Sequence, residues 1–313
     1  MSFRRPTMGE TPTTVLFLLL AAIWGSSFVA IKIGIADVPA LSFAAIRYSI
    51  AGLIVLAYAA HTTDRWRPRG RREWVLAATV GLFVIGIYHG ALYLGEHDVS
   101  APIAAIVISL APILTAGFAS KLHENVTIDG TQAAGLLAGL AGVVIVANPG
   151  SAGSVDLGGL LLVFLAAASF ALGGVLTGKL PGGGGLPVET MEAWAMLIGS
   201  LALWVGAAVR GENVTAVHWT PTALASLAYL TLVCGAGGFL LYFVLLERAG
   251  ATEINLVSYL EPIGASVVAW ALFGDVVSPR ALAGFAVIFA GFALVKHRYI
   301  GAAVRNTTDD AEL

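Results

Sequence analysis

The sequence predicts an all-α integral membrane protein with ten transmembrane helices in two inverted five-helix repeats. The first observation is a series of ten apolar stretches, each near the ~20 residues that a helix needs to cross a bilayer. The second is an internal repeat, in which short sequence patterns recur 150 residues further along the chain. The third is the placement of Lys and Arg, which fall mostly in alternate connections between the stretches.

The ten stretches are joined by short connections that leave no room for a soluble domain. Backbone amides in hydrocarbon must find partners within their own segment, so each stretch is expected to be a helix. In chain order the stretches are 13–33, 40–60, 74–94, 100–120, 130–147, 157–178, 188–209, 222–246, 254–273 and 279–295. We divide the chain into a first repeat over 1–150 and a second repeat, with a cytoplasmic tail, over 151–313.

Composition agrees with a membrane location. The chain is 58% hydrophobic and 12% charged, and its net charge is −2, which argues against nucleic acid as a partner. The single cysteine, Cys234, lies inside a predicted helix and leaves no disulfide to form.

The positive-inside rule gives the orientation. Placing the N-terminus in the cytoplasm puts thirteen basic residues inside: Arg4, Arg5, Arg65, Arg67, Arg69, Arg71, Arg72, Lys121, Lys179, Arg248, Lys296, Arg298 and Arg305. Only Lys32, Arg210 and Arg280 then lie in the outside connections. We therefore predict a multi-pass protein of the inner (plasma) membrane with both termini cytoplasmic.

The internal repeat aligns residues 101–126 with residues 251–276 without a gap. Its most distinctive part is the Leu-x-Pro-Ile sequence, which occurs at 110–113 and again at 260–263. One residue out of that register, Gly135 and Gly142 match Gly284 and Gly291. An odd number of helices per copy makes the second copy enter the membrane from the opposite side. Inverted repeats are the construction of many secondary transporters, with substrate held near the midplane, although a duplication can also be purely structural.

Several segments resemble the EamA-type transporters of the drug/metabolite superfamily. The opening Trp24-Gly25-Ser26-Ser27-Phe28-Val29-Ala30-Ile31-Lys32, then Ala44-Ala45-Ile46-Arg47-Tyr48, is similar to the start of that family. Each Leu-x-Pro segment leads to a counterpart of the family's Leu-Gly-Glu ending, with His123 replacing the glycine in one half and Asp275 the acid in the other. The resemblance covers nearly the whole chain. It implies ten helices, a central cavity between the repeats and export of small metabolites, most closely as in the aromatic and neutral amino-acid exporters.

Ionisable side chains within hydrocarbon are functional candidates, because they normally face the bundle interior or a cavity. The guanidinium of Arg47 offers two parallel hydrogen bonds to a substrate carboxylate; a structural ion pair or snorkelling is the alternative. His89 lies between Tyr88 and Tyr93 and either lines the cavity or bonds a neighbouring helix.

Glu261 precedes Pro262 near mid-depth of the ninth stretch, where it is open to three roles: binding an ammonium, carrying a proton or offsetting Arg47. Asn255 and Ser258 precede it at intervals of three and would form one polar stripe with it, beside Tyr259.

We also expect aromatic side chains to line the cavity, and glycine and proline residues to let helices bend. The predicted substrate-binding residues are Trp24, Arg47, Tyr88, His89, Tyr93, Trp194, Tyr242, Asn255, Ser258, Tyr259 and Glu261. The predicted bending residues are Gly86, Gly90, Pro112, Gly235, Gly237, Gly238 and Pro262.

The sequence favours a transporter over an enzyme. A membrane metalloprotease needs a cluster of His, Glu and Asp ligands, which His89 and Glu261 do not supply. We expect no catalytic residue, metal or cofactor, and a small-molecule substrate within the lipid bilayer; the sequence leaves the oligomeric state open. The expected function is export of aromatic and neutral amino acids by facilitated alternating access. The alternatives are nucleosides, sugars or drugs as substrates, or an intramembrane enzyme.

Overall fold

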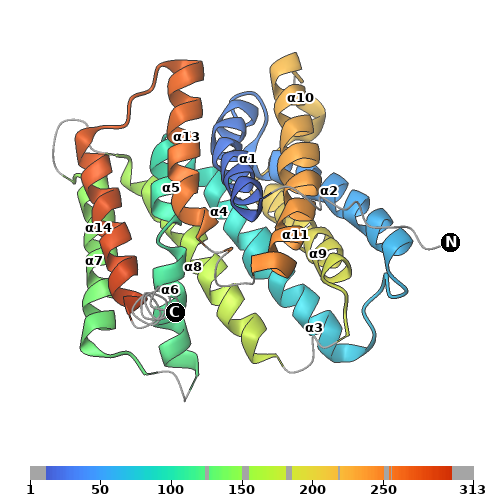
Figure 1. Cartoon of the computed structure of the whole chain (residues 1–313). Helices are drawn as coiled ribbons and strands as arrows, with labels where there is room; N and C mark the ends of the chain where they lie inside the picture. The colour runs from blue at the N-terminus through green and yellow to red at the C-terminus, as the bar shows by residue number, and fades with distance from the viewer. Residues whose placement is uncertain are drawn as a thin grey trace.

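The computed structural model describes residues 12–123, 127–149, 155–180, 185–217, 219–249, 254 and 256–297. Over these residues the chain is a bundle of helices without a strand (Figure 1). Eight helical segments of the described chain are long and apolar enough to cross a membrane. Two further apolar helices at the end of the described chain have 17 residues each. The predicted all-helical class is confirmed, while ten crossings stay a prediction.

The first half of the chain follows the predicted stretches closely. Its helices are α1 (Thr13–Gly34), α2 (Ala40–Thr62), α3 (Gly70–Val80), η1 (Gly81–Ile87), α4 (Tyr88–Gly95), α5 (Ala101–Ile108), α6 (Ala111–Leu122) and α7 (Gly130–Ala147). The segments α3, η1 and α4 form one continuous span from Gly70 to Gly95, and α5 with α6 forms the next.

The second half repeats this plan. Its helices are α8 (Leu157–Lys179), α9 (Val188–Val209), η2 (Val214–Ala216), α10 (Pro221–Ala228), η3 (Tyr229–Gly237), α11 (Gly238–Ala249), α13 (Val257–Phe273) and α14 (Pro279–Val295). The ninth stretch, predicted to start at 254, becomes continuous helix only from Val257.

Two spans contain π-helical segments at matching places of the repeat. The segment η1 covers 81–87, whose counterparts at the 149-residue offset that relates Leu92-Tyr93 to Leu241-Tyr242 are 230–236, and η3 covers 229–237. Both segments hold glycines from the predicted bending set: Gly86 in η1, and Gly235 and Gly237 in η3. π-Turns inside α-helices occur frequently at functional sites.

The two prolines behave differently. Pro112 is the second residue of α6 and follows a break at Ser109 and Leu110, because proline supplies no amide proton and clashes with the preceding turn. Pro262 lies inside α13, which continues through it.

Helix α7 packs on α14 through glycines that let the backbones meet. A Cβ atom added at Gly135 would lie 2.5 Å from the carbonyl oxygen of Gly291, and one at Gly142 would lie 2.7 Å from that of Gly284. The reverse contacts are as close, at 2.6 Å for Gly291 and 2.7 Å for Gly284. Small residues at such interfaces allow the close approach that holds helices together in lipid.

We expect Gly135→Ala to destabilise the protein by about 1–3 kcal/mol, because the added methyl group overpacks a backbone contact. Thermal unfolding in detergent measures this effect. Gly174→Ala is the matched control, since Gly174 lies within α8 and a Cβ there has no neighbour within 4 Å. Equal melting temperatures for the two variants would contradict the packing argument.

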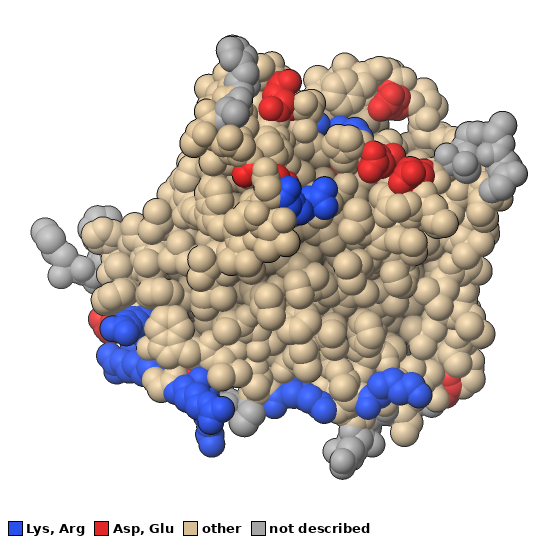
Figure 2. All heavy atoms as spheres, turned by 180° about the vertical axis from the view of Figure 1, so that it is seen from behind, with Lys and Arg blue, Asp and Glu red and all other residues tan. Residues whose placement is uncertain are grey.

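Charged residues divide between the two ends of the bundle. Lys and Arg gather along one edge, and most acidic groups lie near the opposite edge beside a few basic ones (Figure 2). One contact between distant parts of the chain marks each end. At one end Arg65 donates to the carbonyl of Gly185. At the other end the Glu212 carboxylate accepts from the amide of Ser42 at 2.8 Å.

Candidate functional site

A group of polar and aromatic side chains from α2 and α4 meets inside the bundle. We call Arg47, Tyr48, Tyr88, His89 and Tyr93 the central cluster. Arg47 donates to the hydroxyl of Tyr93 at 2.6 Å, and its guanidinium lies 4.7 Å from the ring centroid of Tyr48. His89 is hydrogen-bonded to the Tyr48 hydroxyl through Nε2, and its Nδ1 lies 3.1 Å from the carbonyl oxygen of Ile85. The cluster therefore joins four of the predicted binding residues.

Local structure explains why these side chains converge. His89 and Tyr93 are four residues apart on α4 and so share a face. The π-turns of η1 end immediately before Tyr88, and the ring of Tyr88 lies 4.3 Å from that of His89. Phe170 of α8 closes one side of the cluster, 5.4 Å from Tyr88 between ring centroids.

Arg47 is the cation of the cluster. Its side chain is 5% exposed, its Nε has no hydrogen-bond partner, and no ion pair joins it to a carboxylate within the described residues. A guanidinium held in this way keeps hydrogen-bonding capacity for an anionic group.

Two carboxyl groups approach the cluster from the second half of the chain. Glu261 of α13 is 7% exposed and interacts electrostatically with Tyr88. Glu192 of α9 is also 7% exposed and interacts with Tyr48. Neither acid is paired with a cation in the described part of the chain.

An aromatic group lies on the α1 side. The indole of Trp24 stacks on Tyr242 at 5.7 Å and lies 5.9 Å from Phe239. Its Nε1 donates to the carbonyl of Cys234 in η3 at 3.3 Å. Next to Trp24, Gly25 meets the backbone of α13, where an added Cβ would lie 2.7 Å from the Glu261 carbonyl oxygen. Helix α1 therefore contacts η3 through Trp24 and α13 through Gly25.

Other predicted residues lie away from the cluster. The ring of Trp194 packs on that of Trp74, with 4.8 Å between the ring centroids, and its indole donates to the carbonyl of Trp66. These contacts lie near the N-terminal end of α9. Tyr259 faces α14, with its ring 4.3 Å from Phe292. Ser258 is half-buried on the same helix, and Asn255 lies outside the described residues.

Sequence reasoning missed Tyr48 and Glu192 as site residues. Glu192 falls inside the predicted seventh stretch, so the rule that flagged Glu261 applied to it as well. Tyr48 carries no such signal, because only the packing of α2 against α4 places its hydroxyl on His89.

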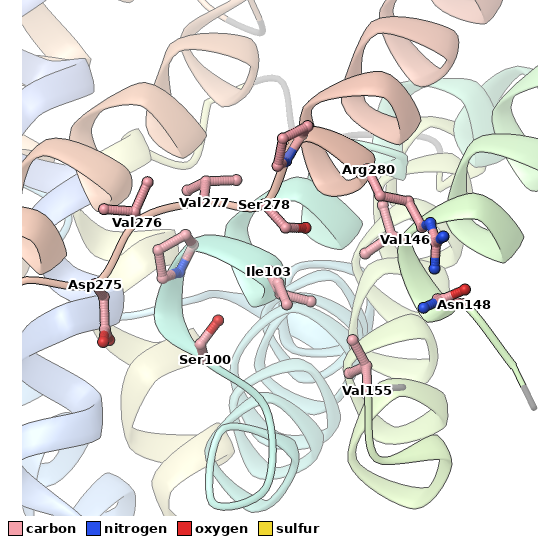
Figure 3. A pocket seen from close by; sticks show the side chains of 12 residues that line it. Ser100, Ile103, Val146, Asn148, Val155, Asp275, Val276, Val277, Ser278 and Arg280 are labelled. Atoms are coloured by element: carbon pink, nitrogen blue, oxygen red, sulfur yellow. The ribbon is translucent and has the colours of Figure 1, made fainter. Parts of the chain in front are cut away.

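A separate pocket of 670 Å³ opens at the end of the bundle, away from the central cluster. It is bordered by the start of α5, the end of α7 and the α13–α14 connection. Figure 3 shows Arg280 and Asn148 near one another on one side of this pocket and Asp275 on the other.

Comparison with known proteins identifies the family to which the chain belongs. The EamA-like transporter family matches twice, over residues 12–148 and 157–296. The chain is 28% identical to an uncharacterized transporter, YvbV, of Bacillus subtilis, over 91% of this chain and 92% of that one. It is 28% identical to the uncharacterized inner membrane transporter YedA of Escherichia coli, over 88% of each chain.

A probable terminal-alkyne amino-acid exporter of Streptantibioticus cattleyicolor is also 28% identical, over 91% of this chain and 93% of the relative. A solved structure described only as the crystal structure of a protein has the same fold. Its TM-score is 0.58 at 18% identity, and the match covers 90% of this chain and 96% of that one. The two family matches span most of the sequence, and the chain is therefore a membrane transporter that belongs to the EamA-like transporter family.

Proposed function

We propose that this transporter exports aromatic and neutral amino acids by facilitated alternating access between two inverted five-helix repeats. The observation that carries the proposal is the buried Arg47, which has no carboxylate partner among the described residues and is surrounded by aromatic rings. A substrate carboxylate would supply that partner, and Tyr88 and Trp24 offer aromatic surface for a side chain. Glu261 would meet the substrate ammonium, and His89 and Tyr93 would orient the substrate.

The α7–α14 contact supports the inverted relation of the repeats. Gly135 corresponds to Gly284 in the second copy, and Gly142 to Gly291. Gly135 contacts Gly291 while Gly142 contacts Gly284, which is the reciprocal pattern that a two-fold axis produces. The repeats we propose are 1–150 and 151–313, rocking around the central cluster with η1 and η3 absorbing the bend.

The charge distribution supports the proposed orientation. The Arg-rich connection before α3 and the ends of α6 and α8 share the basic edge of Figure 2. By the positive-inside rule this edge faces the cytoplasm, and both termini lie there in an inner (plasma) membrane. The ends of α4, α7, α9 and α13 then face outward.

Flux into proteoliposomes tests the proposed substrate. We expect phenylalanine and leucine to move down their own gradients, with nucleosides and sugars transported poorly. Cells that express the protein should also resist toxic amino-acid analogues. Flux of nucleosides or sugars without amino-acid flux would contradict the proposal and favour the alternative substrates.

The same vesicles test the absence of proton coupling. An imposed pH difference should leave the final amino-acid distribution at equilibrium, and His89→Ala should slow transport without changing that result. Accumulation above equilibrium that disappears in His89→Ala or Glu261→Gln would show that transport is coupled.

A further inference from the structure

Lys32 of α1 reaches across the proposed outer end of the bundle and caps the end of α4. Its ammonium donates to the carbonyls of Glu96 at 2.5 Å, His97 at 2.9 Å and Val99 at 3.1 Å. These carbonyls lie at and just beyond the C-terminus of α4, where the helix dipole favours a cation. A lysine ammonium has three protons, and this contact uses all of them.

The side chain of Glu96 lies beside this contact and takes no part in it. The residue is 0% exposed, and both carboxyl oxygens are buried without a hydrogen-bond partner among the described residues. Lys32 and Arg47 act on the carboxyl electrostatically, but neither forms an ion pair with it. Burial outweighs both cations and raises the pKa of Glu96 well above its usual range.

The remaining titratable neighbours do not provide a donor. Tyr88 and Tyr93 of α4 interact with Glu96 through space, and Tyr93 accepts from Arg47. Neither tyrosine hydroxyl donates to the Glu96 carboxyl oxygens. Asp156, at the start of the adjacent α8, accepts from the amide of Gly159. The exposed pair His97 and Asp98 bond one another at 2.9 Å, and Asp275 acts on Lys32 rather than on Glu96. A buried carboxylate without donors is costly, so the arrangement requires the neutral acid.

We propose that Glu96 is a proton-binding site at the outer end of the transporter, occupied when the Lys32 contact closes α1 against α4 and vacated when they part. This inference rests on the alternating access of the proposed function. Opening the outer end hydrates the carboxyl, which then loses its proton to the outside medium. Closing takes one proton back from the same medium, so the site makes closure sensitive to external pH without driving net proton transport.

The sign follows from proton linkage. Because the closed state binds the extra proton, acid outside favours closure and alkali favours opening. Between the two pKa values of the carboxyl the open-to-closed ratio changes by up to about tenfold per pH unit.

Spin-label distances test the proposal without any substrate. Labels at Ala36→Cys and His97→Cys, both exposed positions, report the separation of α1 and α4 on a Cys234→Ser background. We expect the ratio of the long-distance to the short-distance population to rise by up to about tenfold per pH unit as external pH increases. Glu96→Gln should remain at the short distance at every pH, while Asp98→Asn keeps the response of the parent protein.

A pH response that survives in Glu96→Gln would overturn the proposal. Infrared spectroscopy provides a second test: at acid pH the protonated-carboxyl band of the parent protein should be stronger than that of Glu96→Gln by the contribution of one carboxyl. An identical band in both proteins would contradict the assignment. The two proposals fail separately. Loss of amino-acid flux leaves the distance measurement intact, and a pH-independent distance with normal amino-acid flux removes only the proton site.

Discussion

Replacing Arg47 with methionine is expected to weaken amino-acid binding by roughly 10- to 100-fold and to reduce transport accordingly. The guanidinium is the only buried cation of the central cluster, and it lacks a carboxylate partner within the described residues. Losing a charged hydrogen-bonding group costs about 1.5–3 kcal/mol, which is roughly 10- to 100-fold in substrate affinity. Binding of phenylalanine and flux in proteoliposomes, measured on the same preparation, give the two readouts.

Arg47→Lys is the matched variant, because it keeps the charge but loses the planar fork that grips a carboxylate at two points. We expect it to retain weak transport. Tyr93→Phe removes the hydroxyl that accepts from Arg47 and should reduce transport less than either change at position 47. If Arg47→Met transports normally and only melts at a lower temperature, Arg47 is a structural residue.

Replacing Glu261 with glutamine is expected to lower the affinity for zwitterionic substrates by roughly 10- to 100-fold, because the substrate ammonium loses its charged partner. N-Acetylphenylalanine has no ammonium, so its low flux should not change in the variant. Competition for phenylalanine flux in proteoliposomes measures both effects.

Glu192→Gln is the matched control, since this acid is equally buried but approaches the cluster from α9. A selective loss of zwitterion transport in Glu192→Gln, with Glu261→Gln unaffected, would move the ammonium site to α9. Equal losses of both substrates in Glu261→Gln would instead indicate a packing defect at the contact with Gly25.

The sequence predicted the broad plan because a bilayer acts on each segment separately. A stretch must be long, apolar and internally hydrogen-bonded to cross the membrane, so composition alone located most of the helices. The internal repeat can also be found from the sequence alone, because the two copies share residue patterns such as the two Leu-x-Pro-Ile segments. The family resemblance is confirmed by the two matches over 12–148 and 157–296.

Only the tertiary structure decided which side chains meet. Arg47, His89 and Tyr93 were predicted together and do converge, while Trp194 lies against Trp74. Helical spacing gives the face of a residue within its own helix, but the partner across the interface depends on how two helices cross and rotate. For the same reason, sequence alone did not indicate that Lys32 caps α4, or that the Glu96 carboxyl is buried without a donor among the described residues. The number of residues between two positions carries no information about whether they touch.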